Sequence, residues 1–196
     1  MIPWNLQGGA LVSIERDLSR YMILVSGAPG SGKTTLALPL ARTLNFALIS
    51  KDALKEALFD ALNGPADDLE FSRVASDAAM ELLWVMAPNC PHVILEANFR
   101  PRSGYERDRI EALKGQKVEI YCRCPPEEAA RRFALRAGML GHHPAHALKS
   151  LSMEMLAEYD RPVAACPVIE VDTTQPVDIP RLVEKVREHW SDAVVS

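Results

Sequence analysis

The sequence contains few cysteines, and none of them stands in a metal-binding pair. There are four among 196 residues, Cys90, Cys122, Cys124 and Cys166. Cys122 and Cys124 stand two apart in a segment that the pattern predicts to be a strand, which is poor spacing for zinc ligands. We therefore expect reduced thiols in the core or on strands rather than a zinc site.

The sequence also lacks a long apolar run. No window approaches the roughly 18 uninterrupted apolar residues that a membrane-spanning helix needs. The N-terminus has no basic segment followed by an apolar stretch, so it does not match a signal peptide. These absences predict a cytoplasmic protein that is not embedded in a membrane.

Positive charge is not in excess. The 22 Lys and Arg residues are outnumbered by 26 Asp and Glu residues, which gives a formal net charge of -4. A dedicated nucleic-acid binder normally has a basic surface, so nucleic acid is an unfavoured partner, although local basic patches remain possible. A small-molecule partner fits better. The length favours one α/β domain over residues 21–196, with residues 1–20 as an N-terminal extension, and we find no repeats.

One motif dominates the chain. An apolar run, Tyr21 to Ser26, is followed by a complete G-x-x-x-x-G-K-T element and then by a helical pattern. Glycines allow the backbone to turn its N-H groups around an anion, and the helix adds its positive end. The lysine should reach the β- and γ-phosphates of ATP, and the hydroxyl of Thr34 should ligate Mg²⁺. The predicted phosphate-binding residues are Gly27, Ala28, Pro29, Gly30, Ser31, Gly32, Lys33, Thr34 and Thr35.

Short apolar runs alternate with helical patterns along the rest of the chain, which predicts strand-helix-strand units and a parallel sheet. We expect a three-layer α/β/α fold of the P-loop NTPase type, with five strands in the order 2-3-1-4-5 and a helical lid. The expected strands are Tyr21–Ser26, Phe46–Ser50, His92–Ala97, Lys117–Cys122 and Pro167–Val171. The expected helices are Lys33–Leu44, Asp52–Leu62, Asp67–Met86, Ser103–Lys114, Pro126–Ala137, Leu148–Tyr159 and Ile179–Trp190.

Two classes of phosphate-loop protein, the GTPases and the motor ATPases, do not fit this sequence. The base-reading N-K-x-D element of GTPases is absent, and motor ATPases are usually larger. From about residue 21 to 190 the layout resembles small P-loop kinases, above all the group that contains chloramphenicol phosphotransferase, zeta-type toxins and polynucleotide kinase. The matching segments are Ile49–Lys55, Val93–Phe99, Arg131–Arg136 and Val171–Thr174. The resemblance implies transfer of the ATP γ-phosphate to an acceptor beneath a closing lid.

Asp52 is the first catalytic candidate. It follows the second strand, so it should lie at the carboxyl edge of the sheet, where ligands collect. In the similar kinases an aspartate here orients or deprotonates the acceptor hydroxyl. The alternative is that Asp52 only caps the following helix. Lys55, one turn further, should face the same way and contact substrate, but it lacks the bidentate fork of the arginine that polynucleotide kinases favour.

A second group of candidates follows the third strand. Glu96 should reach the same edge, where it could hold Mg²⁺ through a water, contact the acceptor, act as an alternative base or simply pair with a structural arginine. Asn98 lies on the loop that lines the acceptor pocket in the similar kinases. Arg100 and Arg102 on this loop could grip an anionic part of the substrate, unless they are merely solvated.

The segment 131–147 is predicted to form the lid. A lid arginine can neutralise charge on the transferring phosphoryl group, and we favour Arg132 and Arg136 for this role. In related kinases the lid often reads R-H-P, whereas this chain has His142-His143-Pro144. A metal site formed by His142, His143 and His146 is disfavoured, because no acidic or cysteine partner is near in sequence.

By the same resemblance, Thr173 and the polar turn that follows the last strand should pass beside adenine. The whole pattern predicts an ATP- and Mg²⁺-dependent phosphotransferase that acts on a hydroxyl of a small molecule, either a metabolite or an antibiotic. Two alternatives remain open. One is a 5′-hydroxyl polynucleotide kinase, and the other is a nucleotide-gated regulatory module without transfer. The identity of the acceptor and the oligomeric state cannot be read from these residues.

Overall fold

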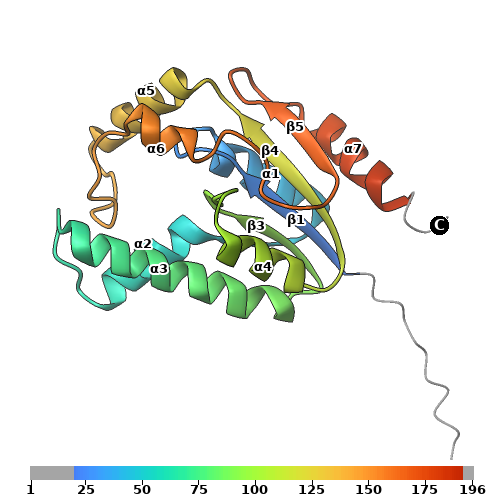
Figure 1. Ribbon diagram of the computed structural model, residues 1–196, viewed down its shortest axis with the longest axis horizontal. Coiled ribbons are helices and arrows are strands. Elements are labelled where there is room, and N and C mark those ends of the chain that lie inside the picture. The colour runs from blue at the N-terminus through green and yellow to red at the C-terminus, as the bar shows by residue number, and fades with distance from the viewer. Residues whose placement is uncertain (1–19, 192–196) are drawn as a thin grey trace, which may run out of the picture.

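The computed structural model describes residues 20–191, and these form a parallel sheet (Figure 1). The strand order is β2-β3-β1-β4-β5, and every paired strand runs parallel to its neighbour. The predicted strand number and order are therefore confirmed. The strands are β1 (Tyr21–Ser26), β2 (Ala47–Ser50), β3 (His92–Glu96), β4 (Gln116–Arg123) and β5 (Val168–Asp172).

The helices agree with the sequence pattern except before β5. A helix was expected over Leu148–Tyr159, but only Met153–Ala157 is helical, so this prediction is wrong. The side chain of Ser152 accepts a hydrogen bond from the Met155 N-H and starts the helix there. The helices are α1 (Lys33–Leu44), α2 (Lys51–Ala61), α3 (Leu69–Met86), the 3-10 helix η1 (Ala87–Asn89), α4 (Gly104–Ala112), α5 (Pro126–Ala137), α6 (Met153–Ala157) and α7 (Ile179–Ser191).

The extension predicted over residues 1–20 lies, apart from Arg20, outside the described residues. Within residues 20–191, no helix is both long enough and apolar enough to cross a membrane.

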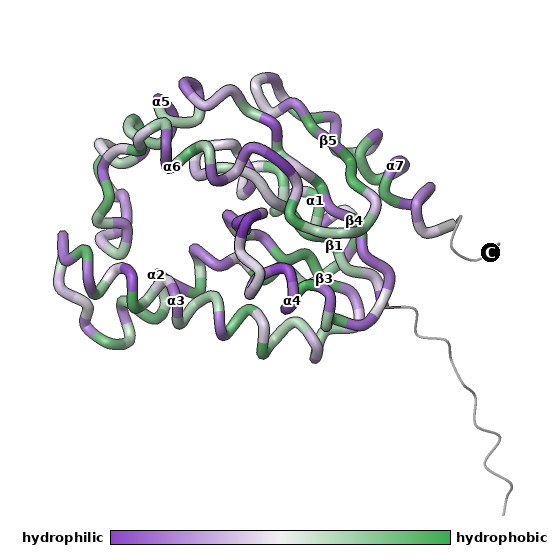
Figure 2. Tube along the Cα trace, in the orientation of Figure 1, coloured by the Kyte–Doolittle hydropathy of each residue, from purple (hydrophilic) through white to green (hydrophobic). Residues whose placement is uncertain are grey.

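The sheet is covered on both faces, which produces two hydrophobic cores. Ile23 and Val25 of β1 face α1 and α7, whereas Met22 and Leu24 face α3 and α4. This alternation follows from the two-residue period of a strand. Figure 2 shows the resulting concentration of hydrophobic residues along the central strands. The three-layer α/β/α arrangement is therefore the one that the apolar runs predicted.

The carboxyl ends of the strands meet at one edge of the sheet, and the segments around that edge come from distant parts of the chain. In Figure 1, α5 and α6 lie on one side of this end and α2 and α3 on the other. The irregular segment 138–152 connects α5 to α6 and reaches α2, where His143 Nε2 lies 3.2 Å from Asp60 Oδ1. The segment predicted to form the lid therefore contacts α2.

A buried carboxyl group in β4 fixes the approach to β5. Glu119 is completely buried, and its oxygens accept hydrogen bonds from the backbone N-H groups of Val163 (2.9 Å) and Ala164 (2.7 Å). It also accepts a hydrogen bond from the hydroxyl of Ser26 in β1. One side chain thus joins β1, β4 and the segment that leads into β5.

We predict that Glu119→Ala lowers the free energy of unfolding by about 3 kcal/mol or more, because it leaves several buried donors without an acceptor. Urea unfolding monitored by circular dichroism measures this. The control is Glu170→Ala, which removes an exposed carboxylate from β5 and should change stability by less than about 0.5 kcal/mol. Equal losses in the two variants would contradict this role for Glu119.

Candidate active site

The phosphate loop joins β1 to α1 and packs against α5. Gly30 has a φ of +82°, and a Cβ atom there would lie 2.2 Å from the carbonyl oxygen of Ala129. Both the backbone angle and the close approach therefore require glycine. The buried Ser31 hydroxyl has no hydrogen-bond partner among the described residues, and Lys33 Nζ donates to the Ala28 carbonyl at 2.8 Å. An unpaired hydroxyl and a buried amine at this loop suit a phosphate.

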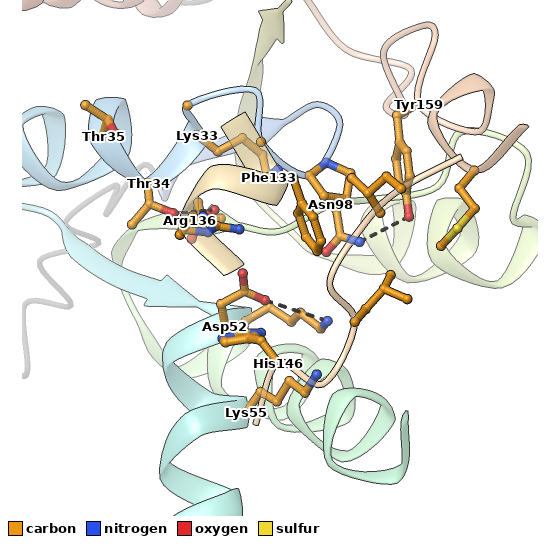
Figure 3. A pocket seen from close by; sticks show the side chains of 18 of the residues that line it. Lys33, Thr34, Thr35, Asp52, Lys55, Asn98, Phe133, Arg136, His146 and Tyr159 are labelled. Atoms are coloured by element: carbon orange, nitrogen blue, oxygen red, sulfur yellow. Dashed lines mark hydrogen bonds and ion pairs between the residues drawn. The ribbon is translucent and has the colours of Figure 1, made fainter. Parts of the chain in front are cut away.

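A cavity of about 230 Å³ opens in front of the loop (Figure 3). It brings together residues from α1, α2, α3, β3, α5 and the lid segment. Of the predicted site residues, it is lined by Pro29, Gly30, Gly32, Lys33, Thr34, Thr35, Asp52, Lys55, Glu96, Asn98 and Arg136. The structure thus gathers most of the predicted site in one place.

Asp52 lines this cavity. In Figure 3 it stands between Thr34 and Lys33 on one side and Lys55 on the other. Helix α2 begins at Lys51 and its N-cap residue is Ser50, so the interpretation of Asp52 as the helix cap is wrong. The Asp52 carboxylate is free to face the cavity.

The electrostatic surroundings of Asp52 keep it ionised. Burial alone would raise the pKa of its carboxyl group. The positive charges of Lys51, His146, Lys33 and Arg136 outweigh this effect and hold that pKa below its usual value. The pKa of Lys33 is lowered, mainly because burial disfavours its charge. Cations from three different elements therefore surround one carboxylate.

Glu96 connects the phosphate loop to the start of α2. Its carboxyl oxygens accept hydrogen bonds from Thr34 Oγ1 at 3.2 Å and from Ser50 Oγ at 2.5 Å. Within residues 20–191 the side-chain partners of Glu96 are these two hydroxyls and not the structural arginine of the predicted alternative. A hydroxyl and a carboxylate oxygen side by side suit Mg²⁺, which prefers oxygen ligands and completes its shell with water and phosphate oxygens.

Arg100 and Arg102 are already paired with acidic residues. Arg100 Nε lies 2.7 Å from Glu106 Oε1, and Arg102 lies 2.8 Å from Asp160. These contacts hold Arg100 at a neighbouring polar cavity of about 140 Å³ and hold Arg102 against α6. Their predicted contact with an anionic substrate stays a prediction.

The two favoured lid arginines lie in different places. Arg136 lines the main cavity with Lys33 and Asp52. Arg132 instead lines a second cavity of about 300 Å³, where its Nη1 donates to the Thr173 carbonyl at 3.0 Å. Arg136 is thus the one of the two that lines the same cavity as Asp52, and the catalytic roles of both arginines stay predictions.

The second cavity lies on the other side of the phosphate loop and is mostly apolar. Gly32 and Thr35 line both cavities, so the two spaces meet at the loop. The remaining wall comes from Leu36, Arg132, Thr173 and the turn 175–177, with Pro39 and Ile179 from α1 and α7. Apolar walls next to a phosphate site can receive the flat ring of a nucleotide base.

Sequence reasoning missed several residues of the main cavity. They carry no motif, and most belong to the lid or to neighbouring helices. They are Lys51, Ser72, Phe133, His146, Leu148, Leu151, Met155 and Tyr159. The histidines do have acidic partners, because Glu56 lies 2.8 Å from His146 and Asp60 contacts His143. Even so, the described residues contain no cluster of three or more metal-ligating side chains.

A comparison with protein families matches residues 22–162 to the AAA domain. This match covers most of the chain, and the chain belongs to this family. Its matched range includes the phosphate loop and every predicted acceptor-side residue.

The chain is also similar to individual kinases. A cytidylate kinase of Pyrobaculum arsenaticum is 32% identical over 127 residues, covering 60% of this chain and 61% of that protein. A shikimate kinase of Corynebacterium glutamicum is 33% identical over 122 residues, covering 58% of this chain and 64% of that protein. The chain thus spans less than two thirds of the length of these curated relatives.

Among solved structures, a "putative kinase" of Chloroflexus aurantiacus is similar with a TM-score of 0.75 and 29% identity, covering 87% of this chain and 98% of that one. The shikimate kinase of Acinetobacter baumannii, in complex with shikimate, has a TM-score of 0.56 at 18% identity, covering 89% and 95%. At this low identity, the similarity to the shikimate kinase structure shows a shared fold and nothing more.

We predict that Glu96→Gln weakens divalent-cation binding by about tenfold or more, because it removes the carboxylate charge but keeps the side-chain shape. Mn²⁺ electron paramagnetic resonance with bound nucleotide measures this. The control is Glu111→Gln, an exposed residue of α4, which should leave Mn²⁺ affinity unchanged. Unchanged affinity in Glu96→Gln would exclude Glu96 from the cation site.

The lowered pKa of Lys55 predicts that the free energy of unfolding depends on pH. Burial, and then the neighbouring charge of Lys51, lower its pKa to about 8. Between pH 8 and 10.5 the unfolded chain binds more protons than the folded one, so folding becomes more favourable as pH rises. From pH 7 to 9.5, wild type should gain about 1–2 kcal/mol relative to Lys55→Met, measured by urea unfolding in an anion-poor buffer. The exposed control Lys114→Met should show the same change in the free energy of unfolding as wild type. If Lys55→Met gains as much stability between pH 7 and 9.5 as wild type does, the prediction is contradicted.

Proposed function

We propose that the protein is an ATP- and Mg²⁺-dependent phosphotransferase that moves the γ-phosphate of ATP to a hydroxyl group of a small molecule. The observation that carries this proposal is the position of Asp52. Its ionised carboxylate faces the same cavity as Lys33, Thr34 and Arg136. A phosphate site and a proton acceptor across one small cavity are the parts that phosphoryl transfer to an alcohol requires.

The nucleotide would lie across the phosphate loop. Lys33 would contact the β- and γ-phosphates, and the base would occupy the apolar cavity beside Arg132 and Thr173. Thr34 and Glu96 would hold Mg²⁺, which neutralises phosphate charge when bound. This assignment gives Arg132 a contact with the nucleotide as well as its predicted catalytic role.

The acceptor would lie on the α2 side of the cavity. Its hydroxyl oxygen attacks the γ-phosphorus, the bond from that phosphorus to the β-γ bridging oxygen breaks, and ADP leaves with that oxygen. The hydroxyl proton passes to the Asp52 carboxylate. Arg136 offsets the negative charge on the transferring group. Lys55, Glu96 and Asn98 would contact the acceptor.

The relatives support this proposal. Proteins similar to this chain are named cytidylate kinase and shikimate kinase, and both names describe phosphoryl transfer to a small molecule. The similar structure from Chloroflexus aurantiacus carries a kinase description as well. We also propose that, among small kinases, the protein is most similar to the group that contains chloramphenicol phosphotransferase, zeta-type toxins and polynucleotide kinase.

The test is ADP release from ATP and Mg²⁺ across a panel of sugars, nucleosides, nucleotides, hydroxy acids, antibiotics and 5′-hydroxyl oligonucleotides. We predict that Asp52→Asn lowers kcat about 100-fold or more while ATP affinity stays within about threefold, because only the proton acceptor is lost. Lys33→Ala should weaken ATP binding and abolish turnover, because it removes the phosphate-binding amine.

Asp108→Asn, which changes an exposed carboxylate of α4, is the matched control and should behave like wild type. Equal loss of ATP binding in Asp52→Asn and Lys33→Ala would assign Asp52 to the nucleotide site. Tight ATP binding without acceptor-dependent ADP release would favour a nucleotide-gated module. If the 5′-hydroxyl oligonucleotide is the only acceptor of the panel that is phosphorylated, the result would favour a polynucleotide kinase.

A further inference from the structure

Two lysines on α2 are buried at the acceptor side of the main cavity. Lys51 is 8% exposed and Lys55 is 7% exposed, although lysine is rarely buried without a charged partner. They stand four residues apart, so their side chains share one face of the helix. Both line the cavity that contains Asp52.

The protein itself leaves most of their hydrogen-bonding capacity unused. An ammonium group has three N-H donors. Lys55 Nζ donates one hydrogen bond, to Ser72 Oγ at 2.8 Å. Lys51 makes no hydrogen bond with its ammonium to any residue in 20–191, and its nearest carboxylate oxygen, on Asp52, is 3.8 Å away. Both amines therefore have donors available for a ligand.

The carboxylates near these lysines are already engaged. Glu96 accepts hydrogen bonds from Thr34 and Ser50. Glu56 contacts His146 on the lid. Asp52 is therefore the one acidic group of the cavity wall that faces both lysines without a hydrogen bond of its own in the described chain. The cavity wall carries four cations, Lys33, Lys51, Lys55 and Arg136, and two carboxylates, Asp52 and Glu96, so positive charges outnumber negative ones on it.

Lys55 lies away from the phosphate loop (Figure 3). Lys33 and Arg136 lie beside the phosphate loop, whereas Lys55 lies beyond Asp52 (Figure 3). Lys51 also lines the neighbouring polar cavity, which extends toward Asn98 and Tyr159. An acceptor whose hydroxyl faces Asp52 would therefore place another of its groups against these amines.

We propose that the phosphate acceptor is an alcohol that also carries an anionic group, a carboxylate or a phosphate, and that Lys51 and Lys55 bind this group. The proposal rests on the phosphotransferase function argued above and names its substrate class. The cavity volume of about 230 Å³ suits a small molecule rather than a polymer. Leu148 and Leu151 of the segment 138–152 and Met155 of α6 would cover the uncharged part of the acceptor.

A competing interpretation is that Lys55 is buried for a structural reason and not to bind a ligand. Ser72 Oγ, which accepts from Lys55, donates in turn to the Ala145 carbonyl at 2.7 Å. Lys55 thus also links α2, α3 and the lid, and Lys55→Met could loosen that link. Lys51 has no such link, so Lys51→Met is the cleaner variant.

The first experiment measures anion binding without catalysis. Wild type is saturated with Mg²⁺ and the β,γ-imido analogue of ATP, which fills the triphosphate site, and is then titrated with inorganic phosphate or with acetate by calorimetry. We expect wild type to bind one or both anions. Lys51→Met should weaken this binding about tenfold or more, because charge-assisted hydrogen bonds are lost. The exposed control Lys114→Met should match wild type.

Preference for phosphate or for acetate identifies which anionic group the lysines take. No anion binding to wild type, or equal binding to wild type and Lys51→Met, would overturn the proposal. Lys55→Met should also weaken binding, and its melting temperature reports any loss of the structural link.

The second experiment compares matched acceptors that differ in one anionic group, namely gluconate with glucose and glycerol 3-phosphate with glycerol. We expect the charged member to have a kcat/KM about tenfold or more above its neutral partner. Lys51→Met should raise KM for the charged acceptor with little change in kcat, whereas a structural defect would lower kcat and the melting temperature together.

The two proposals fail in different ways. Faster turnover of the neutral members would overturn the anion site and leave the phosphotransferase intact. If no acceptor consumes ATP, the phosphotransferase proposal fails, and the calorimetric result still decides whether the lysines form an anion site.

Discussion

The buried side chain of Glu96 is the contact on which the candidate site depends. It stands at the end of β3, between β1 and β2 in the sheet, and accepts hydrogen bonds from Thr34 of the phosphate-loop helix and Ser50 before α2. Parallel strands bring their carboxyl ends to one edge, but the edge alone does not fix the side chains. Glu96 connects the start of α1 to the start of α2, and this sets Asp52 opposite the phosphate loop.

The lid is held by contacts of a different kind. Hydrogen bonds and ion pairs from α2 and α3 reach the segment 143–146 through Lys55, Ser72, Glu56 and Asp60. Several of these groups are partly exposed, and exposed ion pairs contribute little to stability. The central sheet is instead stabilised by two buried apolar cores. The segment 143–146 is therefore attached to α2 and α3 mainly by polar contacts, whereas burial of apolar side chains stabilises the sheet.

Sequence patterns predicted the elements well where local signals were strong. The phosphate loop, the five strands and helices such as Lys33–Leu44 and Pro126–Ala137 follow from apolar periodicity, glycine and proline. The helix expected over Leu148–Tyr159 failed because Ser152 caps a shorter one. The acidic partners of the lid histidines could not be found, since Glu56 lies 90 residues from His146 along the chain. The lack of a hydrogen bond from the Lys51 ammonium within residues 20–191 likewise depends on packing between distant segments, which no local pattern predicts.

The charges in the cavity bear on how Asp52 would act. Cations on both sides lower the pKa of its carboxyl group, so the group is a weak base at neutral pH. A weak base removes little proton from an alcohol before the phosphoryl group moves. Phosphoryl transfer does not need early deprotonation, because its transition state is loose and the hydroxyl becomes acidic as its bond to phosphorus forms. Asp52 would then orient the hydroxyl and receive its proton late. The same cations that make Asp52 a weak base would offset the negative charges of the ATP γ-phosphate and of the anionic group of the acceptor.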